Sequence, residues 1–432
     1  MLQDDYRRMQ EDWDRRAAED ANYYVAFGRR GQTEAEFFDT AREQAHGLEM
    51  EIERLPPASP RARRALEIGC GPGRLMLPLS RHFGEIHGVD ISSQMIARAR
   101  ANLAAVPHAH PHHAPNCDLA AFADDSFDFV YSFAVFQHIP SRDVVFGYLR
   151  ESWRVLKPGG ILRCQINGLP KSSKQYDTWA GVRIPAQEIR DFAREQGFLL
   201  LALDGTETQY MWVTMRKPPA PPLPGDPVSQ PAIVRRVTNT YSPEPAAPIR
   251  GRFAALSVWV ENLPAEADLS MLSVRIGGVE AQLIYLTHPQ PDLPRQLNLL
   301  VPPGMSTGFH RVDVRWQGEL LPQPVWVRLI APGPPIPKVL SVSDGVELLS
   351  ETRILTGVVK LAVEEVDPPE RISVTIAGQA VAEPDFFCTD PRLPCWDINC
   401  PVPVTVAAGP ASIVVRAGSR IIGAANVEIV PR

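Results

Sequence analysis

The sequence predicts two architectures in one chain: an α/β part with a mostly parallel sheet, followed by two all-β units. Three observations predict this. Between residues 64 and 217, short apolar runs alternate with helix-like segments, which is typical of a parallel sheet covered on both faces. Proline, which ends helices, is unevenly spread: 12 of the 43 prolines precede Lys217 and 31 follow it. The second half also contains an internal repeat.

Length, charge and composition narrow the function classes. The chain has 432 residues, enough for two or three domains. Its net charge of −6 disfavours nucleic acid as the main partner. No apolar run approaches the ~20 residues that span a bilayer, and the N-terminal stretch lacks the apolar core of a secretory signal. We therefore expect a cytoplasmic protein that is not bound to a membrane.

Two helices are predicted before the first strand. Apolar side chains recur at helical spacing over residues 1–30 and again over residues 33–55. Thr33 and Glu36 have the spacing of a capping box, and Pro56 ends the second helix.

The α/β part follows in a regular order. Apolar runs predict strands near residues 64–69, 85–91, 110–115, 127–133, 161–166, 198–203 and 210–215. Helix patterns lie near residues 74–83, 92–103, 141–156 and 185–197. Ser92 is a good N-cap, whereas Pro185 and Gly197 bracket the last helix. The third strand contains proline, which suits only a sheet edge.

The second half begins with a proline-rich linker. Residues 218–231 carry seven prolines and no periodic apolar face, which predicts an extended spacer. Beyond it, SVRIGG at 273–278 matches SVTIAG at 373–378. We expect four regions: residues 1–217 as the α/β domain, 218–231 as the linker, and 232–332 and 333–432 as two β-sandwich repeats.

A glycine-rich turn follows the first strand. Gly69, Gly71 and Gly73 let the backbone bend tightly and approach a ligand closely. Asp90 ends the next strand about 20 residues later, where a carboxylate can accept hydrogen bonds from ribose hydroxyls. The pattern departs from the GxGxxG of dinucleotide enzymes because Pro72 stands in the turn. The alternative to a ligand site is that the glycines form only a tight turn and that Asp90 is merely solvated.

The string EIGCGPG, followed by GVDISSQMI, FADDSFDFVYSFAVFQHI and WRVLKPGGIL, resembles the motifs of class I S-adenosylmethionine-dependent methyltransferases. The resemblance covers residues 60–217. It implies an α/β Rossmann-like seven-stranded sheet whose last strand is antiparallel. S-adenosyl-L-methionine would lie across the ends of strands one to four, and S-adenosyl-L-homocysteine would be the product.

The resemblance also implies roles for single residues. The glycines would pass beneath the methionine part and the ribose, Asp90 would bind the ribose diol, and Asp118 with Leu119, or else Asn116, would receive the adenine amino group. The expected cofactor-binding residues are Glu67, Gly69, Cys70, Gly71, Gly73, Asp90, Ile91, Met95, Asn116, Cys117, Asp118, Leu119, Ser132 and Phe133.

The chemistry requires positioning more than a strong base. Holding the nucleophile in line with the methyl carbon can supply about 7–11 kcal/mol of the barrier, whereas a general base supplies roughly 3–5 kcal/mol. His138 is the candidate base, and its alternative is a capping or core histidine. Gln137 could equally orient the acceptor.

The acceptor side is expected to be closed by two aromatic segments. One is the N-terminal helix with Trp13, Tyr23 and Tyr24; the other is residues 167–182, which include Tyr176, Asp177 and Trp179. These side chains fit a lid over a small organic acceptor methylated at oxygen, nitrogen or carbon, and they are as consistent with plain packing. The acceptor itself cannot be named from the sequence.

No metal site is expected. His108, His110, His112 and His113 lie in a predicted loop without acidic or cysteine ligands. Cys388, Cys395 and Cys400 are expected to stay thiols because they lack a fourth zinc ligand and the cytosol is reducing.

The β-units resemble immunoglobulin-like domains of the IPT/TIG type. Such folds carry many functions, so binding of a protein partner, of a glycan or of a second copy all stay open. The methyltransferase interpretation has two rivals: a non-catalytic cofactor-binding protein whose β-units bind the partner, and a nicotinamide-dependent oxidoreductase.

Overall fold

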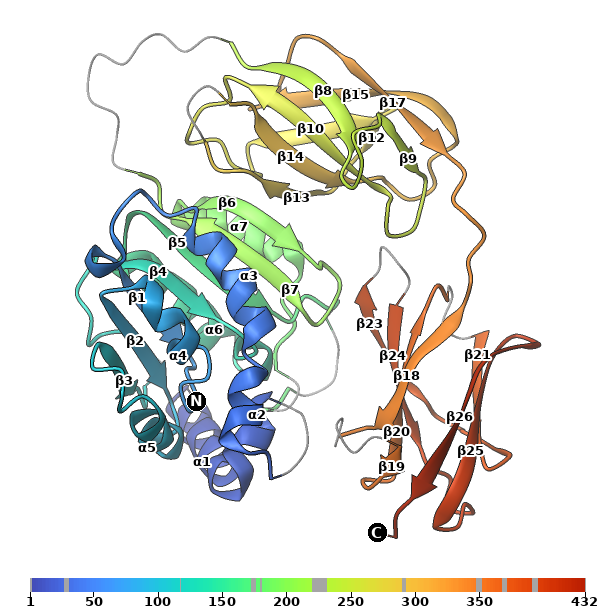
Figure 1. The fold of residues 1–432 in the computed structure, drawn as a ribbon. Helices are drawn as coiled ribbons and strands as arrows, with labels where there is room; N and C mark the ends of the chain where they lie inside the picture. Colours follow the sequence, from blue (N-terminus) through green and yellow to red (C-terminus); the bar gives the residue numbers. More distant parts are fainter. Residues whose placement is uncertain are drawn as a thin grey trace. The chain divides into compact units, whose positions relative to one another are not determined.

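A computed structural model describes residues 2–26, 31–116, 118–171, 176–178, 181–219, 231–289, 293–346, 352–366, 371–390 and 395–431 (Figure 1). The chain forms two compact units. The first contains Met1–Ala21, Ala35–Ile249 and Phe253–Ala331, and the second contains Asn22–Glu34, Arg250–Arg252 and Pro332–Arg432. Among the described helices, none combines the length and apolar character that a membrane crossing requires.

The helices of the α/β part lie close to where the sequence predicts them. They are α1 (Leu2–Ala26), α2 (Glu34–Asp39), α3 (Arg42–Ile52), α4 (Met76–Leu79), α5 (Ser93–Asn102), α6 (Arg142–Val155) and α7 (Ala186–Gln196), with short 3₁₀ turns η1 (Pro60–Ala62), η2 (Ser80–His82) and η3 (Phe136–His138). Ser92 caps α5 by accepting a hydrogen bond from the Met95 amide, and Gly197 ends α7 in the left-handed conformation.

The helix predicted over residues 33–55 is two helices. The chain breaks between α2 and α3, where the Thr40 hydroxyl donates to the Phe37 carbonyl. The break leaves the Thr40 carbonyl outside a helical ladder, and Arg74 donates to it at 3.1 Å. Periodicity alone could not reveal this interruption because the apolar face continues through it.

Seven strands form the predicted α/β sheet. They are β1 (Arg64–Ile68), β2 (Glu85–Asp90), β3 (Ala109–His113), β4 (Phe127–Ser132), β5 (Leu156–Ile166), β6 (Leu199–Asp204) and β7 (Met211–Arg216), in the order β3-β2-β1-β4-β5-β7-β6. Strands β1 to β5 are parallel, whereas β7 is antiparallel to both neighbours. The proline-bearing strand β3 lies at the edge, as predicted. The Rossmann-like α/β fold is thereby confirmed.

Both faces of this sheet are buried. Leu66 and Ile68 of β1 share a core with residues of α6 and α7, whereas Ala65 packs with residues of α3, α4 and α5. Because side chains alternate along a strand, a strand covered on both sides must be apolar on both sides. This explains the continuous apolar runs in the sequence.

The sheet does not end at β6. It continues through β13 (Leu283–Leu286), β14 (Arg295–Leu300), β10 (Ala255–Glu261) and β8 (Ile233–Asn239), giving eleven strands in all. Tyr285 of β13 is opposite Ala202 of β6, and the buried carboxylate of Asp268 accepts a hydrogen bond of 2.7 Å from the Leu200 amide. The first β-repeat therefore belongs to the same compact unit as the α/β part.

The two β-repeats have the same strand order. The second sheet of the first repeat runs β12 (Val279–Glu280), β11 (Leu272–Ile276), β15 (Gly308–Trp316), β17 (Val325–Ile330), β9 (Ala246–Pro248), with β16 (Glu319–Leu320) beside β15. In the second repeat this sheet runs β22 (Gln379–Ala380), β21 (Ile372–Ile376), β25 (Gly409–Ala417), β26 (Arg420–Ile429), β19 (Arg353–Ile354). Its other sheet contains β18 (Lys338–Asp344), β20 (Val358–Glu364), β24 (Cys395–Pro401) and β23 (Asp385–Asp390).

Candidate functional site

The turn between β1 and α4 is built from glycine backbone. Gly69, Gly71 and Gly73 have φ angles of +73°, +51° and +84°, a region that side chains with a Cβ rarely adopt. A Cβ on Gly69 would lie 2.4 Å from the Val135 side chain. The amide of Gly69 donates to the Val89 carbonyl at 2.8 Å, which ties the turn to β2. The result is a cradle of bare backbone that side chains would fill.

Asp90 lies directly beside this cradle. One carboxylate oxygen accepts a hydrogen bond of 2.9 Å from the Gly71 amide, and the other accepts one of 2.8 Å from the Ser92 amide. Each oxygen retains a further lone pair that can accept a ligand hydroxyl. Burial raises the pKa of Asp90 to about 6, and the two amides only partly offset this effect. The two features that the sequence singled out are thus brought together.

The N-terminal helix reaches the same place through a residue that the sequence analysis missed. Asp14 of α1 accepts a 2.6 Å hydrogen bond from the Ser92 hydroxyl and a 3.2 Å bond from the Gln94 amide. Arg98 of α5 donates to the Ala17 carbonyl at 3.0 Å. An isolated aspartate on a helix has the sequence signature of a solvated face, so no local pattern could identify Asp14.

The two predicted lid segments meet each other. Arg16 of α1 donates to the carbonyl and the hydroxyl of Thr178, at 3.2 and 3.1 Å. Asp12 forms an ion pair of 2.9 Å with Arg16 and accepts a hydrogen bond from Thr178. Next in the chain, the amide of Gly181 donates to the carbonyl of Gln137 at 2.8 Å. The second segment therefore joins the N-terminal helix to the turn after β4.

The structure places only some of the predicted aromatic lid residues near the site. Trp13 contacts the His138 ring edge-on, with centroids 5.8 Å apart, and Tyr176 is partly buried against the main core. Tyr23 and Tyr24 contact each other at 5.0 Å, but they belong to the stretch assigned to the other compact unit and are not placed at this site. Trp179 lies outside the described residues.

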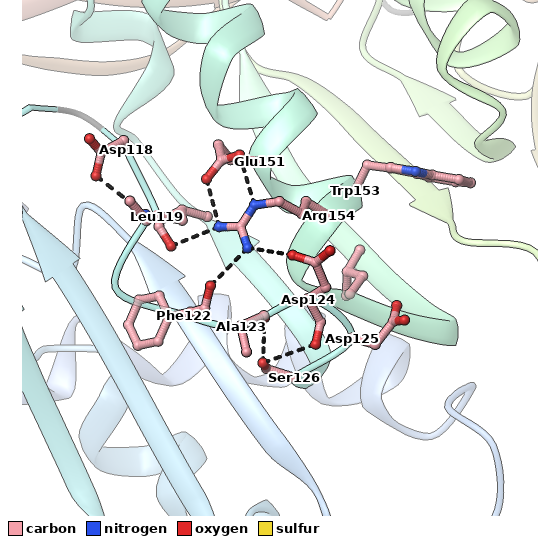
Figure 2. A network of polar contacts seen from close by, with 12 residues as sticks. Asp118, Leu119, Phe122, Ala123, Asp124, Asp125, Ser126, Glu151, Trp153 and Arg154 are labelled. Atoms are coloured by element: carbon pink, nitrogen blue, oxygen red, sulfur yellow. Dashed lines mark hydrogen bonds and ion pairs between the residues drawn. The ribbon is translucent and has the colours of Figure 1, made fainter.

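The loop after β3 is held by one arginine (Figure 2). Arg154 of α6 donates to the carbonyls of Leu119 and Phe122, at 2.9 and 2.8 Å, and forms a two-bond pair with Glu151. It also pairs with Asp124 at 2.8 Å. These hydrogen bonds raise the pKa of Arg154 above its already high ordinary value. Arg154 is a second residue that the sequence analysis missed.

The predicted adenine residues lie on this loop. Leu119 is buried, with 1% exposure, whereas Asn116 and Asp118 are both exposed. The Asp118 carboxylate accepts a hydrogen bond of 3.3 Å from the Ala120 amide, seen at the upper left of Figure 2. Cys117 lies outside the described residues. The choice between Asn116 and Asp118 therefore stays open.

Glu67 is buried at the end of β1, on the side of the sheet that α3 and α4 cover. It accepts a hydrogen bond of 3.0 Å from the Tyr131 hydroxyl. Burial raises its pKa to about 8, although the Tyr131 hydrogen bond and the nearby Arg74 lower it. At neutral pH the side chain therefore carries a proton for most of the time, and it helps to fix β4 beside β1.

The remaining predicted residues are buried, except Phe133, which is partly buried. The Ser132 hydroxyl donates to the Ile68 carbonyl at 2.9 Å. Phe133 stacks on Trp212 with centroids 5.6 Å apart. Ile91 and Met95 are 8% and 1% exposed. The Cys70 side chain is buried, and burial raises its thiol pKa well above the ordinary range, so only its backbone is suited to ligand contact.

The candidate acceptor residues lie on η3, directly after β4. His138 faces Trp13, as described above, and its amide donates to the Val135 carbonyl at 2.8 Å. The side-chain oxygen Oε1 of Gln137 is buried and accepts no hydrogen bond from the described residues. A buried acceptor without a donor is costly, so this amide is suited to orient a ligand group.

The histidine and cysteine clusters lie outside the cradle and form no metal site among the described residues. His110, His112 and His113 lie in strand β3 and not in a loop, and His112 contacts His87 at 3.1 Å. In the described part of the chain, no group of three or more histidine, cysteine or acidic side chains has metal-binding geometry. Cys395 and Cys400 are free thiols, and the Cys388 side chain is not described.

Comparison with known proteins gives a consistent result. Residues 66–164 match a family described as Methyltransferase domain. Phosphoethanolamine N-methyltransferase 2 of Caenorhabditis elegans is 31% identical over 142 residues, 31% of this chain and 32% of that protein. Malonyl-[acyl-carrier protein] O-methyltransferase of Enterobacter lignolyticus is 29% identical over 197 residues, 45% of this chain and 72% of that protein.

A solved structure is also similar to part of this chain. It is a SAM-dependent methyltransferase of Methanosarcina mazei, with 20% identity, a TM-score of 0.31 and coverage of 39% of this chain and 97% of that one. The chain spans only about a third of the length of the first curated relative, 32%, so the match concerns one domain.

Proposed function

We propose that the methyltransferase domain of this chain, whose cofactor is S-adenosylmethionine, transfers a methyl group to an oxygen, nitrogen or carbon atom of a small-molecule acceptor. The observation that carries the proposal is the hydrogen bond between Asp90 and the Gly71 amide, which joins a carboxylate to a bare-backbone cradle. The residues that would hold the cofactor are the glycines of the turn, Asp90, and the loop from Asn116 to Leu119.

The bound cofactor would supply an activated methyl group on a sulfonium. The protein's task is then to hold the acceptor in line and to keep water out, which can contribute about 7–11 kcal/mol to lowering the barrier. The lid formed by α1 and the segment around Thr178 is suited to exclude water. His138 would accept the acceptor's proton, and Gln137 would orient the acceptor through its unpartnered oxygen.

The β-repeats are proposed to be immunoglobulin-like sandwiches. In the second repeat, residues of both sheets, among them Val359 and Ile413, share one core, which supports two packed layers. The regions 1–217, 218–231, 232–332 and 333–432 stay the proposed division of the chain. The cytoplasmic location also stays a prediction.

The cofactor is tested by calorimetric titration with S-adenosylmethionine, S-adenosylhomocysteine and NADH. We expect the two sulfur compounds to bind with micromolar affinity and NADH not to bind. Asp90→Ala removes the acceptor of both ribose hydroxyls, so affinity should fall by about a hundredfold or more. Tight NADH binding without binding of the sulfur compounds would overturn the proposal.

A second candidate function is a cofactor-binding protein without turnover, whose β-repeats bind a partner. It is favoured by the exposed aromatic side chains of the first repeat, Phe309 and Trp326. A screen of small acceptors with radiolabelled S-adenosylmethionine separates the two, because this alternative predicts binding without methyl transfer to any acceptor.

Cofactor affinity should depend on pH through Asp90. Its pKa of about 6 lies above the ordinary 3.8, so the carboxylate becomes protonated as pH falls below 6. The ionised carboxylate is the better acceptor for two hydroxyl groups. We therefore expect the affinity for S-adenosylhomocysteine to weaken by up to about tenfold per pH unit below 6.

Folding stability should change with pH in the opposite direction to cofactor affinity. Because the folded pKa is raised, the ionised carboxylate disfavours folding above pH 6, and this penalty disappears as pH falls from 6 toward 3.8. Thermal unfolding measured beside calorimetry at pH 7.5 and 5 separates the two effects. Unchanged affinity across this range in a folded protein would contradict the role of Asp90.

A further inference from the structure

The outward face of the sheet formed by β11, β15 and β17 carries an unusual set of side chains. Along β15, Val312 and Val314 are buried and the alternate positions point outward. The outward positions of these strands include two exposed aromatic rings and four exposed arginines. We define this arginine–aromatic face by Arg275, Phe309, Arg311, Arg315, Trp326 and Arg328.

The register places these side chains next to one another. Phe309 is opposite Arg328, and Arg311 is opposite Trp326. Directly opposite residues in an antiparallel pair have Cβ atoms about 4.5–5.5 Å apart. Phe309 is 72% exposed and Trp326 is 57% exposed. The face is therefore one contiguous patch in which large rings alternate with guanidinium groups.

The patch has an excess of positive charge. Asp313 is the one carboxylate at the outward positions of these three strands, and it pairs with Arg311 at 2.6 Å. Arg315 and Arg328 form no ion pair with other described residues, and Arg315 donates only to the Gly318 carbonyl at 2.9 Å. Arg275 forms no ion pair either, but it lies opposite Asp313 of β15 and Glu280 of β12 in the strand register. Among the described residues, Arg315 and Arg328 thus have no carboxylate opposite them, and the four arginines of the face outnumber the two carboxylates Asp313 and Glu280.

The second repeat shows that the fold does not require this patch. The same sheet has the same order there, with Ile376 opposite Ile413 where the first repeat has Ile276 opposite Val312. Counting from these pairs, the positions of Phe309, Arg311, Trp326 and Arg328 are occupied by Pro410, Ser412, Asn426 and Glu428. One fold thus carries two different surfaces.

We propose that the arginine–aromatic face binds a short acidic segment of a partner protein. Guanidinium groups bind carboxylates through two parallel hydrogen bonds, and exposed Trp, Phe and Arg are the residue types that dominate protein–protein binding energy. Lysine, which protein interfaces disfavour, is absent from the outward positions of these strands.

Charge favours a short segment over a long polyanion. The chain as a whole carries a net charge of −6, so a polymer that extends beyond the patch would be repelled by the rest of the surface. A short acidic peptide meets only the positively charged face. Nucleic acid and a second copy of the chain are therefore outcomes to exclude and not the expected occupants.

The test is fluorescence anisotropy of the full chain with a short fluorescein-labelled peptide of glutamate and leucine, at low salt. Arg275→Glu with Arg328→Glu should weaken binding by about tenfold or more, and Trp326→Ala should weaken it independently. The matched control is Arg371→Glu with Arg420→Glu, which makes the same charge change on exposed positions of the second repeat and should leave binding within about twofold. Since all these side chains are exposed, thermal unfolding should be unchanged.

Four outcomes would overturn the proposal. If the peptide does not bind, or if the control variant loses as much affinity as the Arg275→Glu, Arg328→Glu variant, the arginine–aromatic face is not a specific binding site. Tighter binding of an oligothymidylate that displaces the peptide assigns the face to nucleic acid. A concentration-dependent dimer in sedimentation that is lost in the Arg275→Glu, Arg328→Glu variant assigns it to a second copy.

Discussion

A chain cut after Lys217 is expected to aggregate or to unfold, whereas a chain cut after Ala331 should remain folded and bind S-adenosylhomocysteine. The first cut removes β13 and leaves β6 as an open edge. Residues 198–203, FLLLAL, include all of β6 except its last residue, Asp204, and carry no charge that would protect such an edge. Long apolar edges without charged residues pair with other chains.

The energetic reason is a shared core. One contiguous cluster of buried side chains runs from Leu203 of β6 through Leu286 and Leu297 of the first repeat. We call the junction between β6 and β13 the seam. Exposing two leucine side chains there costs about 3–6 kcal/mol, which is a large part of the about 5–15 kcal/mol that stabilises a typical domain. Arg54 would also lose Tyr285, whose hydroxyl it contacts and over whose ring it lies at 4.5 Å.

The measurement compares the two fragments with the full chain by size-exclusion chromatography, thermal unfolding and calorimetry. The fragment that ends at Ala331 contains the whole first compact unit, together with the short stretches Asn22–Glu34 and Arg250–Arg252, and it serves as the matched control. A soluble, monomeric fragment 1–217 with the affinity of the full chain would show that the seam is dispensable.

Arg154→Met is expected to loosen the loop that follows β3 and to weaken cofactor binding. Arg154 makes hydrogen bonds to two loop carbonyls and ion pairs with Glu151 and Asp124 (Figure 2). A methionine fills similar space and donates nothing. Loss of these charge-assisted bonds should cost about 2–4 kcal/mol of unfolding free energy after allowance for partial exposure.

Cofactor affinity should fall by about tenfold or more, because the Leu119 backbone would no longer be fixed. Calorimetry with S-adenosylhomocysteine and denaturant unfolding measure the two effects. Arg150→Met, at an exposed position one turn earlier on α6, is the matched control and should change neither. Arg154→Lys should recover only part of the affinity, because an ammonium group cannot reproduce the fork of a guanidinium. An Arg154→Met protein with unchanged affinity would show that the loop is fixed by other contacts.

Local patterns predicted the α/β fold well. The cap at Ser92, the left-handed end at Gly197 and the edge position of the proline-bearing strand β3 all follow from short stretches of sequence. The alternation of strands and helices and the apolar strands predicted the parallel sheet for the same reason. Hydrophobic periodicity and the residues that begin or end an element depend only on residues close together in the chain.

The candidate site was predicted in part. The glycines and Asp90 carry a recognisable spacing, and the structure places them in contact. Asp14 and Arg154 carry no such signal. Each acts through a partner far along the chain, Ser92 for Asp14 and Leu119 for Arg154, and single charged residues on helices have the same appearance when they are merely solvated.

The sequence by itself determined that a glycine cradle and a carboxylate would follow consecutive strands, because that spacing is a local property of the chain. Only the tertiary structure decided that the first β-repeat extends the sheet and that its outward face differs from that of the second. Strand pairing between β6 and β13 joins residues that are far apart in sequence, and which side chains remain exposed depends on what every other segment covers.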